Sequence, residues 1–600
     1  MITAERDWGR RYPPLLVIAV ALVLAILALP SALNLPEANP GQTLEYAPVP
    51  GNQGQAPPGG NLAALGLGES SAGLSQGGGG LGAGLGGLPA LTLPPGQGAV
   101  PSAKQCVGNP PRQTEDPLSP PCVAFFNGDN GGATYQGVSR QEVRILFYFD
   151  CCIQYVGTTH GNDVSPTQTY YDLNAAPQQS EPVFVRALRG YSRYFNARYQ
   201  TYNRFLHFYV YYGSSDSNHT TMISPEQRRA DSVENHQKLK PFAVENFSTF
   251  NSQAYLQAMA QRGVLNFGYS ALGTGVFAGH PSTYFQQFSG LVWDFLPSLE
   301  HQAKLVSSWI CQKVVPYPVS FAGDPTMIGK PRRLAMLHTT DPGFPDIQRY
   351  AQLIKQQVTA CGGNFVADGT FPNACCGISL DYQESAQNEA NFKLQGATTV
   401  IWGGGLQNTD PQAATSVGYH PEWILAGDRG LESAGNAGAD DQSQWAHAWS
   451  VSNVLKIGPF EGEPCYQAWN SSDPASPGPG SFDVSLACTM YDEIRELITG
   501  IQISGPSLNP ASMDKGYHAI PHIASYNPKV PACFYDPGDY TCVKDGEAAW
   551  WDPAEQAPNN TSGTSGCWRL AEGGLRHLID QWPGGDVMRQ ESQGDPCNGF

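Results

Sequence analysis

Hydrophobic and polar positions follow two alternating patterns from about residue 138 onward. Short apolar runs typical of buried strands occur at residues 142–149 (EVRILFYF), 205–212 (FLHFYVYY), 241–247 (PFAVENF) and 264–268 (VLNFG). Between the first two runs, apolar side chains recur at helical spacing at Phe184, Leu188, Tyr191 and Phe195. Strands that alternate with helices form parallel sheets covered on both faces. The pattern therefore predicts a first α/β lobe.

Two further helices are predicted within this first series. Ser224, Pro225 and Gln227 have the residue types of an N-cap, a first-turn proline and a capping-box partner. The stretch SQAYLQAMAQR then forms a short helix that ends at Gly263. Both helices precede a predicted strand, as the α/β alternation requires.

A second α/β series begins with the strand RLAMLH at residues 333–338. The helix after it carries Ile347, Tyr350, Ile354 and Val358 on one face and closes at Gly362 and Gly363. Two more units follow: a helix in 381–394 with the strand TTVIW, and a helix near 411–418 with the strand WILAG. A late amphipathic helix, YDEIRELITGI, indicates that the chain returns to complete the first lobe.

The first 105 residues do not form a domain. Arg6, Arg10 and Arg11 precede an unbroken apolar run from Leu15 to Leu29, a pattern that indicates an export signal. The run is short for a membrane span but no clear cleavage site follows, so an uncleaved anchor is favoured over a cleaved peptide. Residues 36–105 hold 18 glycines and 10 prolines, a composition typical of a flexible tether.

Charge and cysteine content narrow the function. The chain has a formal net charge of −18, nearly all of it beyond residue 105, which argues against a nucleic-acid partner. All 14 cysteines follow the apolar segment, so structural disulfides are expected, with Cys533–Cys542 as a local pair. The neighbouring pairs Cys151–Cys152 and Cys375–Cys376 fit vicinal disulfides, a redox device or cysteines bonded elsewhere.

Loops that follow the strands are the expected ligand-binding positions, because ligands of open α/β sheets lie beyond the carboxyl ends of the strands. Hydroxyl groups and glycine amides there suit a carboxylate, acidic groups suit an ammonium, and aromatic rings suit an apolar side chain. The candidate residues for ligand binding are Ser248, Tyr269, Ser270, Asp341, Phe344, Gly403, Asp428 and Arg429.

Catalytic and metal motifs are poorly supported. GYSALG around Ser270 lacks the second glycine of GxSxG. His518 and His522 have metal-like spacing, but Pro521 argues against an ordinary helix and HExxH is absent. The glycines at 403–405 lack the GK[ST] ending of a phosphate loop. We therefore expect no enzymatic activity, no cofactor and no metal.

The order GVSRQEVRILFYF, a helix containing RYFNARY, and the strand FLHFYVYY resembles the opening of type I periplasmic binding proteins of the leucine/isoleucine/valine class. The stretch PRRLAMLHTTDPGFPDIQRYAQLIKQQVTACGGNFV is similar to the start of that family's second lobe. The lead-in SPPCVAFF and the WWDP and GCWR segments resemble uncharacterised actinobacterial relatives. The resemblance covers roughly residues 138–525.

The resemblance implies a fold of two Rossmann-like lobes joined by three crossings. The Cys-, Trp-, Pro- and Gly-rich composition of residues 465–600 predicts a disulfide-rich C-terminal extension. The expected organisation is 1–35 signal anchor or signal peptide, 36–105 linker, 106–320 lobe 1, 321–460 lobe 2, and 461–600 return to lobe 1 plus a Cys/Trp-rich cap. The family hydroxyl pairs are not cleanly reproduced, so amino-acid specificity is left open.

The function implied is extracytoplasmic binding of a small polar or amphipathic ligand, amino-acid-like in chemistry, with delivery to an ABC-type permease or a sensor. A membrane anchor and a long spacer would replace the family's lipid attachment or free periplasmic form. Two alternatives stay open: an envelope interaction or sensory scaffold that has lost its ligand, and an exported hydrolase whose catalytic groups are not contiguous in sequence.

Overall fold

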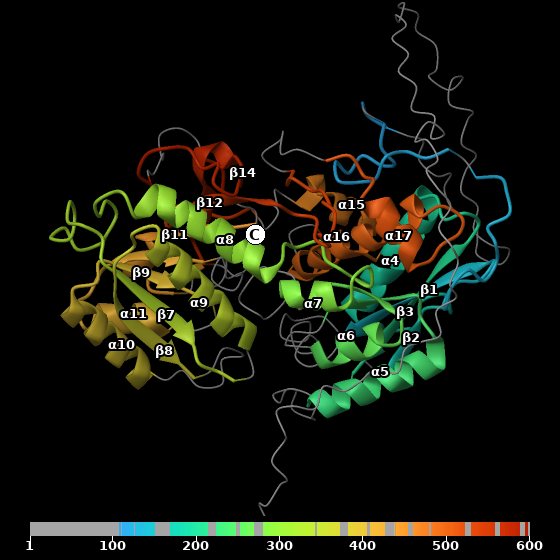
Figure 1. Ribbon diagram of the computed structural model, residues 1–600, viewed down its shortest axis with the longest axis horizontal. Coiled ribbons are helices and arrows are strands. Elements are labelled where there is room, and N and C mark those ends of the chain that lie inside the picture. Colours follow the sequence, from blue (N-terminus) through green and yellow to red (C-terminus); the bar gives the residue numbers. More distant parts are fainter. Residues whose placement is uncertain are drawn as a thin grey trace, which may run out of the picture. The chain divides into compact units, whose positions relative to one another are not determined.

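A computed structural model describes residues 107–597, apart from residues 110, 125, 150–167, 214–223, 248–252, 269–279, 343–344, 373–381, 405–408, 427–436, 439, 454–459, 474, 479–481, 523–529, 559–563 and 588–594. Helices and strands alternate over the first three quarters of the described chain and form two separate sheets (Figure 1). The mixed α/β fold that the sequence predicts is therefore confirmed.

The first sheet has the strand order β2-β3-β1-β4-β5-β6. Its strands are β1 (Glu142–Phe149), β2 (Tyr170–Asp172), β3 (Phe205–Tyr212), β4 (Ala243–Asn246), β5 (Leu265–Phe267) and β6 (Val292–Trp293). The edge strand β2 pairs antiparallel with β3, and the neighbouring pairs from β3 to β6 are parallel. The near-continuous burial of β1 and β3 fits strands covered on both faces.

Helices pack on both faces of the first sheet because successive strand residues point to opposite sides. Tyr148 of β1 stacks on Tyr255 with ring centroids 3.7 Å apart, whereas Phe149 stacks on Phe184 at 5.7 Å. Tyr255 belongs to α6 and Phe184 to α4. The helices of this lobe are α4 (Val183–Arg198), α5 (Pro225–Leu239), α6 (Gln253–Ala260), α7 (Ser282–Gln287), α15 (Pro464–Asn470), α16 (Phe482–Ile503) and α17 (Pro510–Tyr517).

The predicted start of α5 is confirmed in its main feature. The Ser224 hydroxyl accepts a hydrogen bond from the Gln227 amide at 3.1 Å, and Pro225 occupies the first turn. The capping-box role predicted for Gln227 is wrong, because its side-chain amide donates to Asp231 at 2.9 Å. The Gln227 side chain binds the buried Asp231 carboxylate and therefore does not cap the helix terminus.

The second sheet has the order β13-β12-β11-β10-β9-β7-β8, with β14 paired to β12. Its strands are β7 (Leu334–Thr339), β8 (Phe365–Phe371), β9 (Thr399–Trp402), β10 (Glu422–Leu425), β11 (Ala448–Ser452), β12 (Asp545–Asp552), β13 (Cys567–Leu570) and β14 (His577–Leu578). The pairs from β8 to β11 are parallel, and the C-terminal strands are antiparallel additions.

Two hydrophobic cores lie on opposite faces of this second sheet. Met336 belongs to one core with Ile354 of α9, and Leu337 to the other with Phe392 of α10. This alternation along β7 places helices on both faces. The helical segments of the lobe are α8 (Leu299–Trp309), the π-helical turn η1 (Ile310–Val314), α9 (Pro345–Ala360), α10 (Tyr382–Gln395), α11 (Thr409–Ser416), α14 (Gln442–Trp445) and the 3₁₀ turn η3 (Ala571–Gly574).

The chain passes three times between the two lobes. After β6 it enters α8, whose Leu305 belongs to a core of the second lobe. After β11 it passes the 3₁₀ turn η2 (Phe460–Gly462) and returns to the first core, which contains Trp469, Ile494 and Val543. It then enters β12 of the second sheet. The two Rossmann-like lobes and three crossings implied by the resemblance are thus present.

Disulfides connect neighbouring elements within each lobe. The structure contains Cys311–Cys361, Cys465–Cys488, Cys533–Cys542 and Cys567–Cys597, and Cys122 is also disulfide-bonded. The predicted Cys533–Cys542 pair is therefore confirmed. Cys151, Cys152, Cys375 and Cys376 lie outside the described residues, so their pairing stays open.

Within the described ranges, no helix has the length and apolar character needed to cross a membrane. The apolar run from Leu15 to Leu29 lies outside those ranges.

Candidate functional site

Both sheets contain a position where the strand order reverses direction. In the first sheet the chain moves from β1 to β3 on one side and then to β4 on the other. In the second it moves from β7 to β8 and then to β9 on the opposite side. Ligands of such sheets bind at this switch point, beyond the carboxyl ends of the two central strands. The candidate site therefore lies after β1 and β4 in one lobe and after β7 and β9 in the other.

Thr339 shapes the switch point of the second lobe. It is the fully buried last residue of β7, and its hydroxyl donates to the Phe371 carbonyl at 3.2 Å and accepts from the Asp341 amide at 3.0 Å. The Asp341 carbonyl in turn accepts from the Gln348 side chain of α9 at 2.6 Å. These bonds hold Asp341, a sequence-predicted ligand residue, at the carboxyl edge of the sheet.

Gly403 directly follows β9 at the same edge. Its amide donates to the Leu337 carbonyl at 2.8 Å, which continues the pairing of β9 with β7. A Cβ atom at this position would lie 2.7 Å from the Ala351 Cβ and 3.2 Å from the Met336 sulfur. Gly403 thus permits the close approach of α9 to the strand end, a role set by packing, and its amide is already bonded.

Glu245 lies at the corresponding edge of the first lobe. It is the third residue of β4, is fully buried, and neither carboxylate oxygen has a hydrogen-bond partner among the described residues. A Cβ atom on Gly268, which follows β5 with φ of +70°, would lie 3.1 Å from the Asn246 carbonyl and 3.6 Å from a Glu245 carboxylate oxygen. The positive φ and the tight approach to Asn246 both favour glycine at this position beside the buried acid.

Burial raises the pKa of Glu245 well above its usual value, and Glu493 and Glu496 of α16 raise it further. Burial also raises the pKa of Glu493, which accepts a hydrogen bond from the Phe295 amide at 3.0 Å. Arg495, the buried cation of this region, pairs with Asp116 at 3.3 Å and Asp492 at 2.5 Å. Burial and the two neighbouring carboxyl groups thus favour the protonated form of Glu245, which can donate a hydrogen bond.

The sequence-predicted ligand residues divide into two groups. Asp341 and Gly403 follow β7 and β9, so the structure places both at the switch point of the second sheet. The other six, Ser248, Tyr269, Ser270, Phe344, Asp428 and Arg429, lie outside the described residues and stay predictions. All eight positions follow the strands that were predicted to precede them.

Sequence reasoning did not select Glu245 or Thr339. The available signal for Glu245 was an acid within the otherwise apolar run PFAVENF, where an ionised side chain would be costly. Thr339 had no comparable signal, since a threonine at the end of a strand is common in such sheets. Their importance follows from the strand order, which brings both to carboxyl edges.

The histidine pair that was considered as a metal site does not converge on one point. His518 Nε2 lies 3.4 Å from an Asp514 oxygen, and His522 Nε2 lies 3.5 Å from an Asp536 oxygen. His522 also stacks on Phe534 with ring centroids 4.3 Å apart. Each ring is thus engaged with its own carboxylate.

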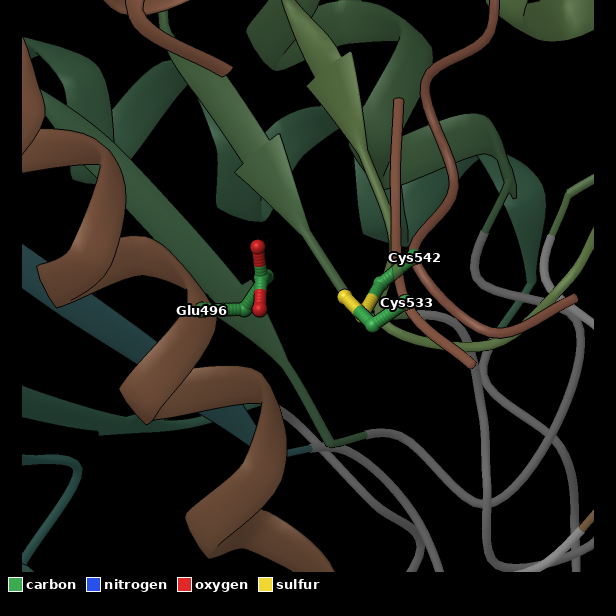
Figure 2. A group of neighbouring side chains, drawn as sticks. All are labelled: Glu496, Cys533 and Cys542. Carbon is green, nitrogen blue, oxygen red and sulfur yellow. A yellow bond between two sulfur atoms is a disulfide. The ribbon is translucent and has the colours of Figure 1, made fainter. Parts of the chain in front are cut away.

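Glu496, Cys533 and Cys542 form a second cluster of metal-ligating residue types (Figure 2). The two sulfur atoms are joined in a disulfide, so they offer no thiolate to an ion. The Glu496 carboxylate accepts a hydrogen bond from the Tyr535 hydroxyl, and burial raises its pKa. The cluster therefore serves the core of the first lobe.

His207 lies between two carboxylates at the amino ends of β1 and β3. Its Nδ1 contacts Glu142 and its Nε2 contacts Asp172, both at 2.8 Å, while its ring stacks on Tyr209 at 4.2 Å. Glu142 is the first residue of β1, so this cluster occupies the sheet edge opposite to the switch point. It ties the edge strand β2 to the sheet.

Protein-family models and curated proteins gave no match. Among solved structures, a Desulfitobacterium hafniense ABC transporter substrate-binding protein in complex with Leu is 12% identical, with a TM-score of 0.43, covering 72% of this chain and 100% of that one.

Two other solved structures show comparable values. A leucine-, isoleucine-, valine-, threonine- and alanine-binding protein from Brucella ovis is 10% identical, with a TM-score of 0.45, covering 75% of this chain and 99% of that one. A Rhodopseudomonas palustris solute-binding protein of an ABC transporter, in complex with 3,4-dihydroxybenzoic acid, is 10% identical, with a TM-score of 0.45, covering 73% and 98%. For this chain, the strand order and the three crossings define the fold.

Proposed function

We propose that the chain is an extracytoplasmic solute-binding protein that closes its two lobes on a small polar or amphipathic ligand. The ligand is amino-acid-like. After binding it, the protein delivers it to an ABC-type permease or reports its presence to a sensor. The chain is held at the cell membrane by an uncleaved helix at residues 15–29. The body from residue 106 onward performs no chemistry on the ligand.

One observation supports this proposal above the others: both sheets repeat the same doubly wound order, and each has its switch point after the first and third parallel strands. Two such lobes joined by three chain crossings suit hinge closure around a ligand. Asp341 in the second lobe and Glu245 in the first are polar side chains that lie near these edges.

The decisive experiment is a thermal-shift screen of the oxidised protein against amino acids, small amides, sugars and aromatic acids. A ligand at 100 times its dissociation constant stabilises the folded state by about 2.7 kcal/mol, which such a screen resolves. We expect a concentration-dependent hit. A flat screen on well-folded protein would instead support the ligand-free envelope scaffold.

The hit is assigned to the proposed site with a variant. Asp428→Ala is expected to weaken ligand binding about tenfold or more while the melting temperature of the unliganded protein stays nearly unchanged, because a loop carboxylate that pairs with an ammonium contributes little to the fold. Asp368→Ala, on the exposed edge strand β8, is the matched control and is expected to bind as the wild type does. Equal affinity of the two variants would remove Asp428 from the site.

A further inference from the structure

A cavity lies at the edge of the second sheet opposite to its switch point. It has a volume of about 390 Å³, in the range of small-ligand pockets. Arg333 immediately precedes β7 and Thr398 immediately precedes β9, so the cavity opens at the amino ends of these strands. Its lining residues are Thr326, Met327, Lys330, Pro331, Arg333, Lys393, Gly396, Ala397 and Thr398.

The lining of this cavity is basic although the protein is acidic. It includes Lys330, Arg333 and Lys393 but no carboxylate, in a chain with a net charge of −18. Asp324, outside the lining, has its pKa lowered chiefly by hydrogen bonds from Thr326 and to a smaller extent by Lys330. Three cations at one cavity therefore give it a local positive potential that favours anions.

Two of the three cations are held in place by helix ends. Arg333 Nη2 donates to the Gln395 carbonyl, and Lys393 Nζ donates to the Val417 carbonyl, both at 2.7 Å. Each bond uses one donor of a side chain that has several, so N–H groups remain for a ligand. Lys330 is the third cation of the lining, and its charge contributes to the lowered pKa of Asp324.

Part of the cavity lining is apolar. Met327, Pro331 and Ala397 contribute apolar surface beside the three cations. A ligand that carries an apolar body beside its negative charge would contact these residues as well as the cations.

We propose that this basic pocket binds a small organic anion with an apolar body, of the class of aliphatic and aromatic carboxylates. The carboxylate lies among Lys330, Arg333 and Lys393, and the apolar body lies against Met327 and Ala397. The site is separate from the switch-point edge and does not depend on the proposed solute-binding function.

The test is photoaffinity labelling of the full-length oxidised protein with a diazirine-bearing benzoate, followed by mapping of the labelled peptides. We expect labels within residues 326–333 and 393–398, competed by benzoate and hexanoate but not by benzyl alcohol or hexanol. Labelling should weaken as salt is raised, because exposed charges are screened. Labels at residues 339–341 alone would assign the probe to the solute site and overturn the proposal.

Variants separate charge recognition from apolar adsorption. Lys330→Gln with Arg333→Gln should reduce labelling about tenfold or more, since charge-assisted hydrogen bonds are lost. Lys304→Gln, at an exposed position of α8, is the matched control and should label fully. Unchanged labelling in the double variant, or equal competition by the neutral alcohols, would contradict the proposal. If the wild type cosediments with anionic phosphatidylglycerol vesicles and the double variant does not, the cations bind a membrane surface, and the proposal of a small organic anion is overturned.

Discussion

Arg332→Met is expected to lower the free energy of unfolding by about 3–5 kcal/mol, because it leaves a buried carboxylate without its cation. Arg332 Nε and Nη2 donate to the two oxygens of Glu422 at 2.8 and 3.0 Å, and the two side chains are 2% and 0% exposed. Arg332 Nη1 also donates to the Val314 carbonyl at 2.9 Å and to Asp586 at 3.0 Å. Urea denaturation followed by tryptophan fluorescence measures the loss.

Glu422 explains why the effect is large. Beyond the arginine, its carboxylate accepts from the Ser320 and Phe321 amides at 2.8 and 3.1 Å and from the Thr399 hydroxyl at 2.6 Å. The amino ends of β7, β9 and β10 are thus joined through one carboxylate. In Arg332→Met with Glu422→Gln the unpaired charge is gone, so the double variant should be more stable than Arg332→Met alone.

The matched control is an exposed ion pair. Arg140 and Asp129 lie 2.9 Å apart with side chains 66% and 69% exposed, so Arg140→Met should leave the urea midpoint nearly unchanged. If Arg332→Met behaved like Arg140→Met, the Arg332–Glu422 pair would not hold the strand ends together.

The free energy of unfolding is expected to rise by about 2 kcal/mol as the pH is lowered from 8.5 to 6.5. Burial raises the pKa of Asp410 and of Asp440 to about 7, and burial also raises that of Asp294 beside Glu493. In the unfolded chain these carboxyls ionise near pH 4. These carboxyls therefore take up protons over this interval in the folded state but not in the unfolded state, so acidification stabilises the folded state.

Near and below pH 6.5, a buried histidine acts in the opposite direction. Burial lowers the pKa of His280 to about 3, so below pH 6.5 the unfolded chain gains a proton there that the folded state excludes. Asp410→Asn and Asp440→Asn should each reduce the slope between pH 8.5 and 6.5, while Asp368→Asn on the exposed edge strand should not. A flat stability profile in the wild type would show that the buried carboxyls are ionised or paired.

Local sequence patterns were sufficient to predict many strands and helices. The runs EVRILFYF and FLHFYVYY form β1 and β3 with the predicted ends, and the helix with Ile347 and Tyr350 on one face forms α9. These segments carry their signal themselves, as continuous burial or as a repeated apolar face. The predicted two-lobe α/β fold depends only on their order.

The strands β11 and β12 were not predicted, for a physical reason. β12, DGEAAWWD, contains acids that are buried only because partners far along the chain neutralise them: Arg576 Nε donates to Asp545 at 2.9 Å, with both side chains fully buried. No local sequence pattern indicates such an ion pair. The switch points escaped prediction in the same way, because the place of β1 between β3 and β4 is a long-range property.

The last crossing of the chain makes the two lobes inseparable. A nascent chain that has reached Ser452 holds every parallel strand of the second sheet, yet β12, the neighbour of β11, is still to be synthesised. The core of the first lobe likewise lacks Trp469, Ile494 and Val543 at this stage of synthesis. Neither lobe corresponds to a continuous gene fragment, so the ribosome must release nearly the whole protein before either half is complete.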